Sequence, residues 1–113
     1  MSTSTPAPVL PASVQGLVAR LIRVFAPEQV LLFGSYARRE ATSRSDVDLL
    51  VVVSCEDDAL ELARRRQQLV GACFPRVDLV PATAQELREA CGERAVFLRG
   101  VLQHGIPLHP PPA

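Results

Sequence analysis

Three short apolar segments constrain the fold of this chain more than any other feature. They are Gln29–Phe33, Asp46–Val53 and Arg76–Pro81, each rich in Leu and Val, which is typical of buried β-strands. Segments with apolar residues at helical spacing alternate with them, and the clearest begins at Ser13 and ends before Pro27. The sequence therefore predicts an α/β fold, a small sheet with helices packed on it.

The lengths of the connections predict the order of the strands. Residues 34–45 are at the lower limit of length for a parallel crossover, so the first two strands are expected to be antiparallel. Residues 54–75 contain a helical pattern and suit a right-handed parallel crossover to the third strand. The remaining expected elements are a short helix at Ser35–Glu40, a helix opened by Ser54, and two helical pieces that start at a Thr83–Glu86 capping box, break near Gly92 and end at Gly105. The predicted order is αβαβαβαα around a three-stranded mixed sheet.

The size and charge of the chain exclude several classes of protein. With 113 residues it forms one domain, expected at residues 13–109, between Pro-rich tails at 1–12 and 110–113. All 12 basic residues are Arg and they balance 12 acids, which gives none of the basic footprint of a nucleic-acid binder. The lack of Lys excludes a P-loop, because that phosphate site requires one.

The cysteines and the amino terminus indicate a location. Three widely spaced cysteines, with no C-x-x-C motif, are expected to be free thiols filling apolar space in a reducing compartment. The first residues lack the pattern of a signal peptide. No apolar run approaches the roughly 20 residues that would span a membrane. A cytoplasmic location is therefore expected, with no membrane contact.

Three carboxylates occupy positions where structure alone disfavours them. Asp46 and Asp48 head one of the most apolar runs, and Asp78 lies within the apolar segment "VDLV". Burying an unpaired carboxylate costs several kcal/mol or forces it to take up a proton. Two residues along a strand span about 6.6 Å, so both aspartates of the D-x-D can reach one or two cations. If the third strand is in register, Asp78 joins them, and the hard oxygen ligands favour Mg²⁺ or Mn²⁺.

Gly34 and Ser35 supply a second half to this candidate site. Glycine directly after a strand permits close backbone approach, and a helix that starts at Ser35 would present free N–H groups to an anion. Each motif alone is common. Together, the strand, the Gly-Ser pair, the ten-residue spacing to D-x-D and the third aspartate predict a site for a Mg²⁺-bound nucleoside triphosphate.

The stretch "GSYARREATSRSDVDLLVVV" resembles the G-S-x₁₀-D-x-D signature of nucleotidyltransferases related to DNA polymerase β. More narrowly, the chain is similar to the minimal nucleotidyltransferase (MNT) family, over residues 13 to about 109. The resemblance implies that Gly34 and Ser35 hold the triphosphate of ATP and that Asp46, Asp48 and Asp78 bind two Mg²⁺ ions. MNT proteins commonly pair with a HEPN-domain toxin, and characterised members are antitoxins that transfer AMP to a tyrosine of that partner.

Two alternatives stay open beside the AMP-transferring antitoxin. One is a nucleotidyltransferase acting on a small hydroxylated molecule, although such enzymes usually carry an additional helical domain. The other is a binding antitoxin that neutralises its partner by contact without catalysis. The motifs for the nucleotide take up most of this short chain, and few residues remain to bind an acceptor. The acceptor surface is therefore expected on a second protein or a second copy of this one.

One residue departs from the family pattern. The family usually has glycine after the Ala-Arg pair, and this chain has Arg39. If that position requires a positive φ, Arg39 will be strained. Arg38, beside it, is expected either to neutralise phosphate charge or to form a surface ion pair.

Overall fold

A computed structural model describes residues 10–71 and 73–110 of the chain. Four strands form one sheet, β1 (Gln29–Phe33), β2 (Val47–Val53), β3 (Val77–Thr83) and β4 (Ile106–His109), in the order β3-β2-β1-β4. The pairs β1·β2 and β1·β4 are antiparallel, and β2·β3 is parallel. Both predicted strand pairings are confirmed, and the sheet is mixed as expected.

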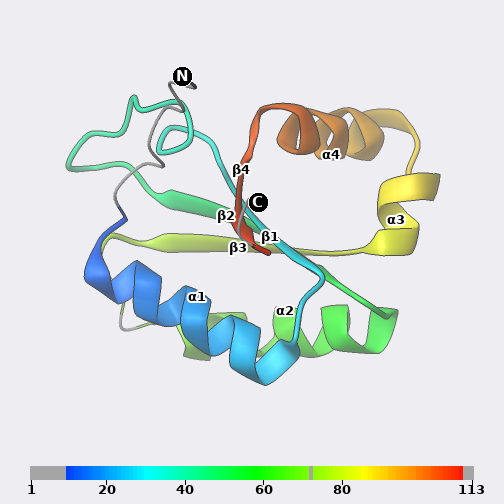
Figure 1. The fold of residues 1–113 in the computed structure, drawn as a ribbon, viewed down its shortest axis with the longest axis horizontal. Helices are drawn as coiled ribbons and strands as arrows, with labels where there is room; N and C mark the ends of the chain where they lie inside the picture. Colours follow the sequence, from blue (N-terminus) through cyan, green and yellow to red (C-terminus); the bar gives the residue numbers. More distant parts are fainter. Residues whose placement is uncertain (1–9, 72, 111–113) are drawn as a thin grey trace, which may run out of the picture.

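Helices cover both faces of the sheet, which gives three layers (Figure 1). On one face lie α1 (Ala12–Phe25) and α2 (Glu56–Val70), and on the other lie α3 (Ala84–Glu89) and α4 (Gly92–His104). Alternate residues of β2 supply the two cores: Val47, Leu49, Val51 and Val53 pack toward α1 and α2, whereas Leu50 and Val52 pack toward α4. The run of apolar residues in β2 thus reflects burial on both faces.

The fourth strand corrects the predicted three-stranded sheet. Residues Ile106–His109 pair with β1, with Pro107 opposite Leu31. A proline within "IPLH" argues against a central strand, but β4 lies at the edge of the sheet, where a missing N–H leaves no partner unpaired. The predicted end of the helical region at Gly105 is confirmed, because the Gly105 N–H donates to the Val101 carbonyl at 2.7 Å.

The ends of the domain and its cysteines add two details. The predicted tails lie outside the described residues except near their inner ends, where Leu10 is buried in the core. All three cysteines are free, as expected, but Cys55 and Cys91 are exposed and only Cys73 is partly buried. The expectation that the cysteines fill apolar space is therefore wrong for Cys55 and Cys91. No helix within the described ranges is long and apolar enough to cross a membrane.

Candidate active site

One row of side chains runs across three strands at one end of the sheet. The ladders pair Phe33 of β1 with Asp48 of β2, and Asp48 with Asp78 of β3. Directly paired residues project from the same face of a sheet, and neighbouring strands lie about 4.8 Å apart. This face is the one covered by α4, because Phe33 packs in the core on that side. The register thus brings Asp48 and Asp78 together, as the alternation in the sequence requires.

Asp46 lies directly before β2 and is exposed, as is Asp78, whereas Asp48 is partly buried. Burial raises the pKa of the Asp48 carboxyl above its ordinary value of 3.8, and the negative charges of Asp78 and then Asp46 raise it further. The guanidinium of Arg38 acts in the opposite direction. Both other aspartates therefore lie close enough to Asp48 to repel its charge.

The donor set fits a divalent metal in its chemistry. In residues 10–71 and 73–110, no three His, Cys, Asp or Glu side chains lie in an arrangement that could hold a metal ion, so the three carboxylates do not form a closed ligand group. They are hard oxygen donors, however, and their mutual repulsion is the interaction that a bound cation would reverse. The chemistry of these oxygen donors suits Mg²⁺, but in the described residues the side chains do not take up a coordination geometry.

Gly34 allows the backbone to pass directly against Asp48. Its φ of 76° is in the left-handed region, and a Cβ at this position would overlap the Asp48 carboxylate. No other residue type fits here without moving that side chain. The Gly-Ser pair and the D-x-D motif, ten residues apart in the sequence, thus meet at one point.

Ser35 lies in a turn and not at the start of a helix, which corrects the predicted helix at Ser35–Glu40. The Arg38 N–H donates to the Gly34 carbonyl at 3.1 Å, and the Glu40 N–H donates to the Ser35 carbonyl at 2.9 Å. The N–H groups of residues 35–37 come before Arg38 in the chain, and Arg38 is the donor of the first of these bonds. An anion at this turn would find N–H groups and a hydroxyl, but not the dipole of a full helix.

The two arginines of this turn behave differently. Arg38 forms an ion pair with Glu40, with 3.2 Å between Nε and Oε2, while its charge also lowers the pKa of Asp48, so both roles expected for it are compatible. Arg39 has a φ of 60°. The departure from the family glycine therefore does place a non-glycine residue in the left-handed region.

Two hollows adjoin the ends of the carboxylate row. Beside Gly34 lies a cleft of about 490 Å³, which we call the α4 cleft, lined by Phe33, Gly34, Ala37, Arg38, Val96, Phe97, Gly100, Val101, His104 and Gly105. Beside Asp78 lies a polar groove of about 410 Å³, whose lining includes Arg66 and Arg76. The sequence reasoning missed both. The glycine in the middle of α4 was the one available signal, because glycine inside a helix costs about 1 kcal/mol.

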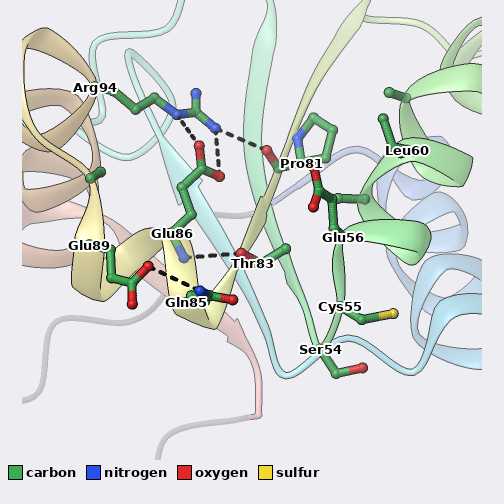
Figure 2. A pocket seen from close by; sticks show the side chains of 13 residues that line it. Ser54, Cys55, Glu56, Leu60, Pro81, Thr83, Gln85, Glu86, Glu89 and Arg94 are labelled. Carbon is green, nitrogen blue, oxygen red and sulfur yellow. Dashed lines mark hydrogen bonds and ion pairs between the residues drawn. The ribbon is translucent and has the colours of Figure 1, made fainter.

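A third hollow, of about 590 Å³, lies at the carboxyl ends of β2 and β3, and its lining does not include the aspartates. Figure 2 shows its lining, where α2, β3, α3 and α4 meet. Its main polar contacts are internal: Arg94 bonds both carboxylate oxygens of Glu86 at 2.9 and 3.2 Å and the Pro81 carbonyl at 3.1 Å. These groups satisfy one another and hold α3 and α4 against the sheet.

Comparisons with known proteins agree with this geometry. Residues 16–101 match the model of a family described as "nucleotidyltransferase domain". A solved structure of a toxin–antitoxin with AMP-PNP has 26% identity and a TM-score of 0.52, over 83% of this chain and 71% of that chain. A predicted nucleotidyltransferase from Sulfolobus solfataricus shares the fold, with 21% identity and a TM-score of 0.54 over 84% of this chain and 75% of that chain.

No curated protein matches the chain in sequence. The matched region contains Gly34, Ser35 and all three aspartates, and the mixed sheet with helices on both faces is the fold of polymerase β-like nucleotidyltransferases. The chain belongs to the nucleotidyltransferase domain family.

Proposed function

We propose that this protein is a Mg²⁺-dependent nucleotidyltransferase that transfers AMP from ATP to a hydroxyl group of a partner protein. The observation that carries the proposal is the row in which Asp48 and Asp78 are paired in register, with Gly34 packed against Asp48. A carboxyl whose pKa is raised by burial and by neighbouring carboxylates, as that of Asp48 is, is costly in a fold and is common at catalytic sites. The family and the fold support the same reaction class.

In the proposed reaction, an acceptor hydroxyl oxygen bonds to the α-phosphorus of ATP, and the bond from that phosphorus to the bridging oxygen breaks. Pyrophosphate leaves, and the hydroxyl proton passes to a base. Asp46, Asp48 and Asp78 would hold two Mg²⁺ ions, which supply charge neutralisation at the phosphates and activation of the acceptor oxygen. Gly34 and Ser35 would hold the triphosphate through backbone N–H groups and the Ser35 hydroxyl. Asp78, the more exposed of the two paired acids, would accept the proton.

We place the acceptor side at β3 beside Asp78, where a polar groove runs between this strand and α2, on the face of the sheet opposite to α4. The lining of the groove includes two arginines, and the groove opens at β3, the edge strand of the sheet. In the described sheet β3 pairs only with β2, which leaves its outer edge open to a partner. A solved toxin–antitoxin resembles the chain at 26% identity, which supports a toxin partner, and we propose a HEPN-domain toxin modified on a tyrosine. The three free cysteines suit a reducing compartment such as the cytoplasm.

Transfer of label tests this function. The purified protein is incubated with Mg²⁺, a lysate of its native host and ATP labelled at either the α- or the γ-phosphate, beside the Asp46→Asn/Asp48→Asn double variant. We expect one protein band labelled from α-labelled ATP alone, absent with the variant, and we expect mass spectrometry to locate AMP on a tyrosine.

Each other outcome has a defined meaning. Label from the γ-phosphate would show phosphoryl transfer and would contradict the mechanism. A labelled small molecule in place of a protein would move the acceptor to the hydroxylated-metabolite class. Absence of label from ATP, while a partner is still captured on immobilised protein, would indicate a binding antitoxin without catalysis.

A further inference from the structure

The α4 cleft is lined by Gly34 and by α4, the helix that covers the same face of the sheet as the carboxylate row. Its walls are Phe33 and the turn after β1 on one side and α4 on the other. Because Phe33 is paired with Asp48, the cleft begins one strand away from the proposed metal ligands. A molecule that binds its phosphates at Gly34 can therefore extend into the cleft.

The aromatic wall of the cleft is held rigidly. The Phe33 and Phe97 rings meet edge to face, with centroids 5.4 Å apart, and the Arg94 guanidinium lies 5.9 Å from the Phe97 ring centre on α4. Arg94 is itself fixed by Glu86 and by the Pro81 carbonyl. The ring of Phe97 thus contacts two side chains, Phe33 and the anchored Arg94, and a flat ligand would find a formed surface.

The helical wall of the cleft keeps space open at a cost in stability. Gly100 lies inside α4, where glycine costs about 1 kcal/mol relative to alanine. A Cβ at Gly100 would meet no atom within 4 Å, so neither packing nor the backbone requires glycine there. One turn earlier, Val96 is 70% exposed at the rim. Arg38 and His104 add polar groups to an otherwise apolar lining, a composition typical of small-molecule sites.

We propose that the α4 cleft binds the nucleobase of the nucleoside triphosphate whose phosphates bind at Gly34 and Ser35. This inference rests on the proposed function, because it assigns the base of the same substrate. The covalent link between triphosphate and nucleoside requires a base site that adjoins the phosphate site, and the α4 cleft touches Gly34 itself. The groove at Asp78 is separated from Gly34 by β2 and is polar, which suits an acceptor better than a flat apolar ring.

Filling the cleft tests the assignment. The Gly100→Leu variant puts a branched side chain into the open space, and it should fold because leucine favours a helix over glycine. The matched control is Gly16→Leu, since Gly16 also lies inside a helix, α1, with no atom within 4 Å of a Cβ. Binding of a non-hydrolysable ATP analogue and of inorganic tripolyphosphate, both with Mg²⁺, is measured by calorimetry for each protein.

We expect Gly100→Leu to weaken binding of the analogue about 10-fold, which corresponds to the loss of one stacked base. Its binding of tripolyphosphate should match that of the wild type, and Gly16→Leu should match the wild type with both ligands. Equal affinity of Gly100→Leu and wild type for the analogue would overturn the base site and leave the proposed function intact. Equal loss of both ligands would also overturn it, because the effect would then lie at the phosphates. A wild type that binds neither ligand would overturn the proposed function itself.

Discussion

At the scale of single residues, Asp48 shows that the candidate site lowers the stability of the fold. It is a partly buried carboxyl beside two other carboxyls, and the Gly34 backbone closes over it. Its raised pKa means that the folded chain holds the Asp48 proton more tightly than the unfolded chain does. Stability from this group is therefore fully present below the unfolded pKa and is lost as pH rises through the folded pKa. The ionised carboxylate that the proposed metal binding requires is the form that the fold disfavours.

The variant Asp48→Asn should be more stable than the wild type at neutral pH, because the amide cannot ionise. The difference should shrink as pH falls toward 3.8, the ordinary value for this carboxyl. Urea unfolding at a series of pH values measures both effects, with the exposed Glu28→Gln as control. A variant that is less stable than the wild type at neutral pH would show that Asp48 has a structural role instead.

Arg39 is a non-glycine residue in the left-handed region of backbone conformation. At φ 60° a side chain costs about 1 kcal/mol, whereas glycine adopts this conformation freely. We expect Arg39→Gly to be about 1 kcal/mol more stable than Arg39→Ala. Comparing these two variants removes the effect of losing the side chain, which both share. Equal stability in urea unfolding would mean that the turn relaxes around residue 39.

At the scale of elements, Arg94 joins α4, α3 and β3. Its guanidinium makes two bonds to Glu86 and one to Pro81, which a lysine cannot reproduce from a single ammonium group. Because the Arg94 side chain is 40% exposed, solvent weakens the pair. We expect Arg94→Lys to lower the free energy of unfolding by about 1 kcal/mol.

The ion pair of Arg64 with Glu61 provides the matched comparison. It lies on one helix at i,i+3 spacing, and the Arg64 side chain is 78% exposed. Arg64→Lys should therefore change the free energy of unfolding by less than about 0.5 kcal/mol. If both lysine variants lose the same amount in chemical denaturation, the contacts of Arg94 to α3 and β3 contribute nothing beyond a surface pair.

The elements that sequence could predict were those with strong local patterns. Alternation along β2 and β3 anticipated the shared face of Asp48 and Asp78, and the connection lengths anticipated both strand pairings. The Thr83 hydroxyl accepts a hydrogen bond from the Glu86 N–H at 3.0 Å and so caps α3, as the motif requires. The Glu86 side chain binds Arg94, and so it does not make the return bond of a capping box. The sequence did not predict β4, because a proline such as Pro107 fits only in a strand at the edge of a sheet. The place of a strand in its sheet depends on the tertiary fold and is not visible in the local sequence.

At the scale of the whole molecule, the carboxylate row lies between two unlike surfaces. The apolar α4 cleft adjoins it at Gly34, and the polar groove with Arg66 and Arg76 adjoins it at Asp78. Local patterns could not predict either surface, because each is made where α4 or α2 packs beside a strand. This arrangement separates the proposed nucleotide side from the proposed acceptor side, so one small domain can hold the donor and leave an open edge for a partner.

The central claim is that the carboxylate row is a metal–triphosphate site and not a structural feature. The most direct measurement is calorimetric titration of a non-hydrolysable ATP analogue into wild type and Asp48→Asn, each with Mg²⁺ and with a chelator. The account predicts binding by the wild type that requires Mg²⁺, and binding at least about 10-fold weaker in a variant that is folded and more stable. Equal affinity of the two proteins, or affinity that does not depend on Mg²⁺, would contradict it.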